Sequence, residues 1–248
     1  MKEIPWGVRM RMLLRSFSVQ GSWNYETLVG AGFAFTILPA LRYLYGTGDE
    51  RFESAVARHS ELFNSHPYFA TVAVGAVSRL EADAAEPIVI QRFKTALRGS
   101  LGSMGDRLFW STWRPMSMLL ALALFLAGAA WWIAVVTFLL VYNTLHLLVR
   151  VRGLRMGTES GLQVGRMLRE APLQTVIDQA SRAACLLVGI AIVLWGAPYF
   201  SDPVAGLLMG AAILFGFSVG LRTRRLLITI MAGITALALA YGIIANGA

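Results

Sequence analysis

The sequence predicts an all-α, polytopic integral membrane protein that has an amphipathic N-terminal helix and re-entrant helices ahead of its continuous spans. Of its 248 residues, 56% are hydrophobic and 15% are charged, and the mean hydropathy is +0.61, whereas a soluble domain carries about 25% charged residues. Apolar stretches long enough to cross a bilayer as helices fill the second half of the chain. We therefore divide the chain into a membrane-surface helix (residues 1–19), a core region with re-entrant helices (residues 20–115) and transmembrane spans (residues 116–248).

The N-terminal segment from Pro5 to Val19 predicts a helix that has proline at its first position. Its apolar side chains recur on one stripe and its arginines lie elsewhere, so we expect this helix to lie on the membrane surface. The stripe comprises Met10, Leu13, Leu14 and Phe17. The next apolar piece, Thr27 to Tyr45, contains two glycines and Pro39, which favours a re-entrant or protein-buried helix over a full span.

A further helix is predicted to start after Thr47. Thr47 and Glu50 have the spacing of a capping box, and apolar residues then recur at helical intervals through Asn64. His59 lies on the apolar face, so we expect it to be a satisfied core histidine or a partner contact. Pro67 ends the helix, because the residue before a proline disfavours helical geometry.

Shorter pieces precede the long apolar run. Phe69 to Leu80 is short enough to be re-entrant or half-buried, Glu81 to Glu86 is predicted to be a solvated loop, and Pro87 opens a helix through Arg98. Glycines at every third position then predict a flexible loop where the backbone closely approaches a ligand or another helix (Gly99, Gly102 and Gly105). Glycines at every fourth position farther on predict one tightly packed helix face (Gly153, Gly157, Gly161 and Gly165).

Four or five stretches are apolar enough to span a bilayer. They are Met116 to Ala130, Trp131 to Val149, Ala183 to Phe200, Val204 to Leu221 and Leu226 to Ala245. The first two share one unbroken run. If both cross, the turn falls near Gly128 or the Trp131–Trp132 pair; if the run is one tilted helix, the number of spans falls by one.

The net charge of +8 arises from 22 basic and 14 acidic residues. Nucleic-acid binding is not indicated, because the basic residues border apolar runs and form no separate domain. The basic residues are better explained as topology signals. Their positions predict a cytoplasmic N-terminus and an external C-terminus. Cys185 is the only cysteine, so no intrachain disulfide or thiolate metal cluster is available, and we predict no metal and no cofactor.

Three short segments gather polar and aromatic residues at the borders of apolar regions: Gln20 to Glu26, Phe63 to Tyr68 and Gly105 to Pro115. Such groups are costly beside hydrocarbon unless they face a protein partner, a headgroup layer or a water-filled site. In this order and at this spacing, the three segments resemble the IID membrane component of the mannose/fructose/sorbose family of bacterial sugar phosphotransferase systems. The resemblance runs from about Arg15 through Gly165.

The resemblance implies a sugar-permease subunit in the bacterial inner membrane. In that family a IID chain pairs with a IIC membrane subunit, and three such heterodimers form a trimer. A hexose binds between the two chains, an elevator-type movement carries it inward, and a IIB protein charged by IIA phosphorylates it. The IID chain itself is not expected to carry the phosphorylated residue.

The candidate sugar-binding residues come from the three segments. Sugar sites combine hydrogen-bonding side chains with aromatic faces that cover the ring. We select Gln20, Trp23, Asn24, His66, Tyr68, Asp106, Trp110 and Ser111. Structural alternatives stay open: Asp106 as the cap of a helix that begins at Leu108, Trp110 as an interfacial anchor, Asn24 as a helix N-cap, and His66 as a hydrogen-bonding residue at a helix end.

Two other functions compete with transport. A membrane enzyme could use His59, His66 and Asp106 as a metal or acid–base set, although no His-rich motif supports it. A non-transporting scaffold or receptor could retain the fold and lack sugar binding. The short link Pro198 to Pro203, where the family commonly has a sizeable polar external segment, favours this second alternative. The sequence does not specify the sugar.

Overall fold

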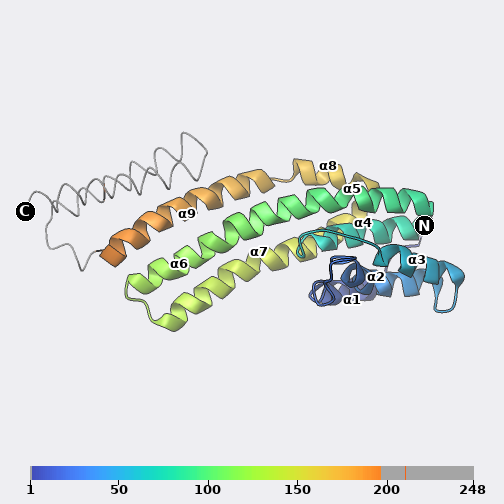
Figure 1. The fold of residues 1–248 in the computed structure, drawn as a ribbon, viewed down its shortest axis with the longest axis horizontal. Coiled ribbons are helices and arrows are strands. Elements are labelled where there is room, and N and C mark those ends of the chain that lie inside the picture. Colours follow the sequence, from blue (N-terminus) through green and yellow to red (C-terminus); the bar gives the residue numbers. More distant parts are fainter. Residues whose placement is uncertain (1, 197–209, 211–248) are drawn as a thin grey trace, which may run out of the picture. The chain divides into compact units, whose positions relative to one another are not determined.

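The computed structural model describes residues 2–196 and residue 210. Within these residues the secondary structure is helical, apart from turns and isolated β-bridges (Figure 1), which confirms the all-α prediction. The chain divides into two compact units. Among the described residues, the first comprises residues 2–107 and 144–171, and the second comprises residues 108–143, 172–196 and 210. The link predicted at residues 198–203 and the spans predicted at 204–221 and 226–245 lie outside the described residues.

In the first unit, α1 (Trp6–Ser16) packs against α2 (Gly30–Tyr45). The predicted N-terminal helix is therefore confirmed. It packs on the protein through Val8, Met12 and Ser16. Leu14 and Phe17 of the predicted apolar stripe stay 62% and 49% exposed, which leaves that stripe available to a membrane or a partner.

Helix α2 continues through Pro39, which has no N–H to donate and whose ring crowds the carbonyl of Phe35 one turn earlier. The Arg15 side chain of α1 supplies the missing donor, since its Nη1 donates to the Phe35 carbonyl at 3.2 Å. The inner face of α2 is fully buried, with Phe33, Ile37 and Leu41 at 0% exposure. This burial agrees with the protein-buried alternative for the segment.

Helix α3 spans Glu50–Ser60, and both of its predicted ends were wrong. Asp49, not Thr47, is the N-cap, because its carboxylate accepts the Arg51 N–H at 2.8 Å. The helix ends at Ser60 rather than Asn64, because the backbone of Phe63 pairs instead with the chain before α2.

Helix α4 (Ala70–Ala82) is almost entirely buried inside the first unit. It includes Glu81, which is only 3% exposed, so the predicted solvated loop starts two residues too early: residues 81 and 82 are helical and buried, whereas residues 83–86 form a largely exposed turn. Gly153 and Gly157 of α7 (Trp131–Ser160) pack on this helix. A Cβ at Gly157 would meet the backbone of Val72, which confirms tight packing on this glycine face.

Pro87 opens α5 (Pro87–Gly105), which continues without a break through a π-helical stretch, η1 (Asp106–Trp113), into α6 (Arg114–Leu126). The predicted glycine loop was therefore wrong. The π-helical stretch directly precedes Pro115, whose ring would clash with the carbonyl of Ser111 in a regular α-helix. Widening the helix by one residue relieves this clash, and such π-bulges are frequent at functional sites.

The described part of the second unit consists of η1 from Leu108, α6, the first part of α7 and α9 (Leu173–Gly196). Helices α6 and α7 are separated by a turn in which Gly128 adopts φ +91°. The run from Met116 is thus two helices, with its turn at one of the predicted positions. Met116, Ala180 and Ala184 form a small core between α6 and α9.

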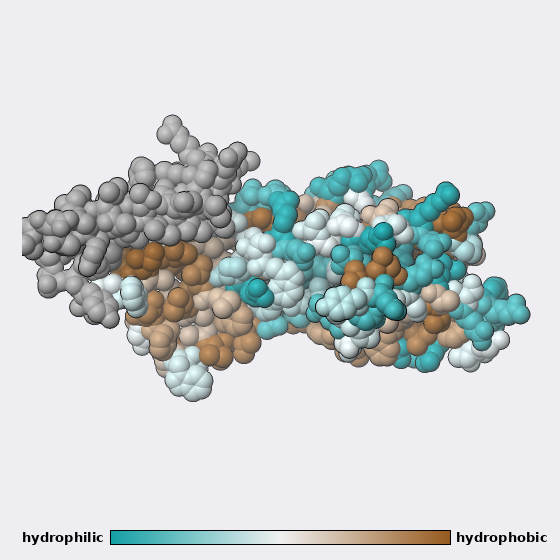
Figure 2. All heavy atoms as spheres, viewed as in Figure 1, coloured by the Kyte–Doolittle hydropathy of each residue, from teal (hydrophilic) through white to brown (hydrophobic). Residues whose placement is uncertain are grey.

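By length and composition, two helical stretches of the described chain are apolar enough to cross a membrane, Pro87–Leu126 and Trp131–Gly196. Hydrophobic surface gathers over the α6–α7 hairpin of the second unit (Figure 2). Its exposed apolar side chains include Leu122, Phe125, Trp131, Leu139 and Leu140. Lipid or a protein partner would cover such a surface.

Two further helical pieces, η2 (Gly161–Gln163) and α8 (Val164–Glu170), complete the first unit. Gly161 has φ +50°, a conformation that glycine adopts at little cost. A Cβ at Gly165 would meet only the Arg169 side chain, at 3.9 Å. The tight glycine face is therefore confined to the earlier positions.

Candidate functional site

The first polar segment forms a turn held by the Asn24 side chain. Its Oδ1 accepts the backbone N–H groups of Glu26 at 3.0 Å and Thr27 at 2.8 Å. Its Nδ2 donates to the Thr27 hydroxyl at 2.8 Å and to the Ser22 carbonyl at 3.2 Å. Asn24 therefore shapes a turn, and it is not the N-cap of α2, which begins at Gly30.

This turn is joined to the second polar segment by backbone hydrogen bonds. The Phe63 N–H donates to the Thr27 carbonyl at 3.1 Å, and the Val29 N–H donates to the Phe63 carbonyl at 3.1 Å. Leu28 between them has φ +54°, a rare conformation for a residue with a Cβ. The Phe63 ring is fully buried against the Phe33 ring, with the centroids 4.7 Å apart. The first two segments are thus locked to each other.

The second segment also packs on the third. His66 lies directly over Gly105, where a Cβ would meet its Cβ and Cγ. A Cβ at Gly102 would lie 3.9 Å from the backbone of Asn64 and Ser65. Glycine is therefore required at position 105 for close approach, not for a loop. The first two segments and the start of the third, residues 105–107, therefore assemble in the first unit, whereas residues 108–115 belong to the second unit.

A cluster of rings and one guanidinium group lies beside His66. The Tyr68 ring stacks on the His146 ring with centroids 3.9 Å apart. Arg150 lies over the Tyr68 ring at 5.0 Å and over the Phe17 ring at 4.8 Å, within the range of a cation–π interaction. Its Nε donates to His146 Nε2 at 2.7 Å. Arg150 also donates to the carbonyl and hydroxyl of Ser16.

His66 is held as a neutral ring. Burial and the nearby charge of Arg150 lower the pKa of His66 from its usual 6.5 to about 4. The Tyr68 N–H donates to His66 Nδ1 at 3.3 Å, which agrees with the structural hydrogen-bonding alternative. A neutral imidazole beside a tyrosine and an arginine offers both hydrogen bonds and aromatic faces, which are the groups that a sugar requires.

The remaining predicted residues are more exposed. Gln20 is exposed, and Trp23 is 48% exposed with its ring edge-on to Tyr25 at 4.8 Å. Trp110 is half-buried beneath the Arg114 guanidinium, 4.7 Å from the ring centroid. Ser111 is exposed. Trp110 and Ser111 belong to the second unit, whereas the other candidates belong to the first.

Asp106 does not cap a helix. It has φ −62° and ψ −42° and lies inside the continuous helix from Pro87 to Leu126, with its side chain exposed. The alternative in which it caps a helix that begins at Leu108 was wrong. Its carboxylate is accessible to a partner or a ligand.

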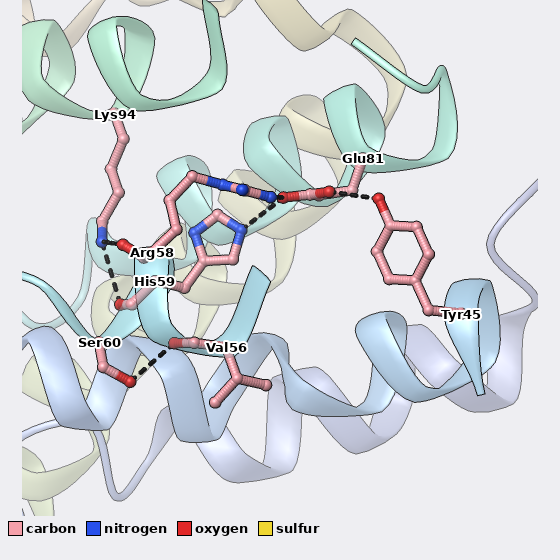
Figure 3. Close-up of polar contacts among 7 residues, drawn as sticks. All are labelled: Tyr45, Val56, Arg58, His59, Ser60, Glu81 and Lys94. Atoms are coloured by element: carbon pink, nitrogen blue, oxygen red, sulfur yellow. Dashed lines mark hydrogen bonds and ion pairs between the residues drawn. The ribbon is translucent and has the colours of Figure 1, made fainter. Parts of the chain in front are cut away.

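A buried polar network in the first unit was missed by sequence reasoning (Figure 3). Glu81 Oε1 accepts from Arg58 at 2.7 Å and from His59 Nε2 at 2.7 Å, and Oε2 accepts from the Tyr45 hydroxyl at 2.5 Å. Lys94 donates to the carbonyls of Arg58 and His59 at 3.1 and 3.0 Å. The available signal was that neither glycine nor proline interrupts the chain between Gly75 and Glu81, so α4 could continue to the carboxylate.

The electrostatics of this network favour a charged Glu81 and a neutral His59. Burial alone would raise the pKa of Glu81, but hydrogen bonds from His59, Tyr45 and Arg58 outweigh it and hold the pKa at about 2. Burial lowers the pKa of His59, and burial together with the Glu81 contact raises that of Tyr45. His59 is thus the core histidine that the sequence predicts, but only its Nε2 is paired, since its buried Nδ1 makes no hydrogen bond within the described residues. The network joins α2, α3, α4 and α5.

The metal-enzyme alternative gains no support. No group of three or more His, Cys, Asp or Glu side chains in the described chain is placed to hold a metal ion. His59 is committed to Glu81, and Asp106 is exposed on its helix.

Comparison with known proteins now decides the family. Residues 7–201 match the family described as the PTS system mannose/fructose/sorbose family IID component. The chain belongs to the IID family. It is 30% identical over 189 residues to the mannose-specific EIID component of Escherichia coli K12, an alignment that covers 74% of this chain and 66% of that protein, just under two thirds. It is also 30% identical to the fructose permease IID component of Bacillus subtilis, over 74% of this chain and 68% of that protein.

Solved structures agree with this membership of the IID family. One is a membrane protein with a TM-score of 0.68 and 28% identity, over 76% of this chain and 70% of that one. Another is the mannose transporter ManYZ in complex with microcin E492, with a TM-score of 0.62 and 25% identity over 97% of each chain. The IID chain is therefore a membrane protein whose fold is similar to that of a sugar-transporter chain.

Proposed function

We propose that this IID chain is a sugar-permease subunit that pairs with a IIC subunit to bind a hexose and translocate it across the bacterial inner membrane, coupled to phosphorylation by IIA and IIB proteins. The observation that carries the proposal is that, in the first unit, the first two polar segments pack together with Gly105 at the start of the third. Asn24 holds the turn of the first segment, and Gly105 lets the third segment pack closely on His66 of the second.

Assembly with IIC is proposed on the exposed apolar surfaces. The α6–α7 hairpin exposes Phe125, Trp131 and Leu140, which lipid or a second membrane chain would cover. The similarity to a chain of the mannose transporter ManYZ supports pairing with a IIC chain. We propose in addition that three such heterodimers form a trimer. We further propose that transport uses an elevator-type movement and that α2 and α4 are re-entrant helices. The N-terminus is proposed to be cytoplasmic and the C-terminus external.

The proposed sugar site retains the selected residues with refined roles. His66 and Tyr68 supply a neutral imidazole and a phenol ring. Arg150 and His146 pack on the Tyr68 ring, and the His66 ring lies edge-on to Tyr68. Asp106 supplies an exposed carboxylate. Gln20, Trp23, Trp110 and Ser111 are proposed as further hydroxyl and ring contacts, and Asn24 as the residue that positions the first segment.

The test is co-expression with a IIC subunit, followed by calorimetric titration of the purified complex with mannose, glucose and fructose. The complex should bind a hexose, and the IID chain alone should bind poorly. Asp106→Asn should abolish binding and leave assembly intact. Asp83→Asn is the matched control, since Asp83 is exposed and pairs only with Arg79 in the described structure.

Asn24→Asp sharpens the test because it keeps the Oδ1 acceptor and removes the Nδ2 donor to Thr27. It should preserve assembly and weaken binding less than Asp106→Asn does. A stable complex that binds no hexose would support the scaffold or receptor alternative. Unchanged binding in Asp106→Asn would remove Asp106 from the site.

A further inference from the structure

A basic cavity lies between α1 and α2, which are side by side in the first unit (Figure 1). Arg11 and Arg15 of α1 and Arg42 of α2 line it, together with Val8, Pro39 and Tyr43. Its volume is about 260 Å³, below the roughly 300–1,000 Å³ of pockets for drug-sized ligands. The cavity therefore suits an anion of headgroup size.

The three arginines have no acidic counterpart. Within residues 2–196 and 210, no ion pair joins Arg11, Arg15 or Arg42 to a carboxylate. Arg11 and Arg15 are one helical turn apart, where like charges repel. Burial and the charges of Arg42 and Arg11 lower the pKa of Arg15. A bound anion would relieve this repulsion.

Arg15 is held in place before any ligand arrives. Its Nη1 donates to the Phe35 carbonyl that Pro39 leaves without a partner, and its guanidinium lies 4.5 Å from the Phe35 ring centroid. This contact uses one of the five N–H donors of the guanidinium. A guanidinium fixed in this way can receive phosphate oxygens with little loss of side-chain freedom.

The surroundings favour a lipid as the source of the anion. Leu14 is 62% exposed, Phe35 is 44% exposed and Tyr43 is 44% exposed, and all three lie on the same two helices as the arginines. An anionic phospholipid joins a phosphate to acyl chains, which matches a basic cavity bordered by apolar side chains. Basic residues on amphipathic helices attract anionic lipid in the same way.

We infer that the cavity between α1 and α2 binds the phosphate group of an anionic phospholipid, with Arg11, Arg15 and Arg42 as the contacting residues. The site is separate from the sugar site, so it anchors the N-terminal helix to the membrane surface whether or not sugar is bound.

Native mass spectrometry of the full chain in detergent tests this inference, with titrations of phosphatidylglycerol, phosphatidylcholine and inorganic phosphate. Phosphatidylglycerol should bind more tightly than phosphatidylcholine. The double variant R11Q/R42Q should bind phosphatidylglycerol roughly 10- to 30-fold more weakly, because it removes two cations. Arg15 is left in place, since it also supports α2.

The double variant R92Q/R98Q is the matched control. It removes the same charge from two α5 arginines that form no ion pair in the described chain, and it should bind phosphatidylglycerol as the wild type does.

Equal weakening in both double variants would mean nonspecific charge attraction and would overturn the inference. Unchanged binding in R11Q/R42Q would overturn it too. Inorganic phosphate that binds as tightly as phosphatidylglycerol would show that the site takes free phosphate and not lipid.

Discussion

The two units differ in what they bury. The first unit buries charged side chains and gives each of them hydrogen-bond partners: Glu81, Lys94 and Arg150 are 3%, 4% and 3% exposed. The described part of the second unit exposes large apolar side chains instead, with Phe125 at 53% and Leu140 at 64%. The average composition of the chain conceals this division. The first unit is organised by internal polar contacts, whereas the second depends on lipid or a partner to cover its surface.

The largest expected loss of stability in the first unit comes from Glu81→Ala. It leaves Arg58 buried without its counter-charge and removes the acceptor of His59 and Tyr45. Loss of one member of a buried pair costs about 3–5 kcal/mol. Chemical denaturation in detergent micelles would measure it, with exposed Asp83→Ala as control. A loss below about 1 kcal/mol would show that the network does not organise the first unit.

A matched leucine pair compares the units directly. Leu41 is fully buried in the first unit, and Leu139 is 49% exposed in the second. Leu41→Ala should lower the free energy of unfolding by about 2–5 kcal/mol, and Leu139→Ala should change it by about 0.5 kcal/mol or less. The same denaturation measurement applies. Equal effects would contradict the assignment of Leu139 to an outer surface.

A glycine pair tests the packing of the third segment on the second. Gly105→Ala places a methyl group against His66 and should cost about 1–3 kcal/mol. Gly99 lies in the same helix, and the position that a methyl group would take there has no neighbour within 4 Å, so Gly99→Ala should stabilise by about 0.5–1 kcal/mol. Thermal unfolding of both variants would give the two signs. Stabilisation by both would mean that His66 does not occupy this position.

The smallest expected effect concerns pH. The pKa of His66 falls from 6.5 to about 4 on folding, so between these values the unfolded chain takes up a proton that the folded chain does not. Stability should therefore fall as the pH drops through this window, by on the order of 1 to 2 kcal/mol after solvent screening. His66→Gln should reduce this slope, and the lowered pKa of His59 accounts for the part that remains. The Glu81 contribution lies lower, since it is lost as the pH falls from 4.5 towards about 2. An unchanged slope in His66→Gln would contradict the shifted pKa.

Local signals were sufficient for much of the fold. Pro5 precedes α1 directly, Pro87 opens α5, and Gly128 marks the turn between α6 and α7. Proline and glycine act through their own backbone restrictions, so their effect is visible without knowledge of distant residues.

Tertiary contacts decided the rest. Gly105 lies in a helix and not in a loop. Its lack of a side chain makes room for His66, which lies far earlier in the chain. Helix α3 ends before Phe63, because the backbone of Phe63 forms hydrogen bonds with Thr27 and Val29. In the candidate site, His66 and Tyr68 could be selected from sequence, but their neighbours Phe17 and His146 come from distant parts of the chain. Such contacts follow from the packing of elements and leave no periodic trace in the sequence.

Hexose exchange in proteoliposomes tests the central proposal most directly. Vesicles that contain this chain together with a IIC subunit should exchange labelled hexose across the bilayer, and vesicles that contain either chain alone should not. Equal exchange by the IIC subunit alone, or no exchange by a complex shown to be assembled, would contradict the proposal that this IID chain is half of a sugar-translocating permease.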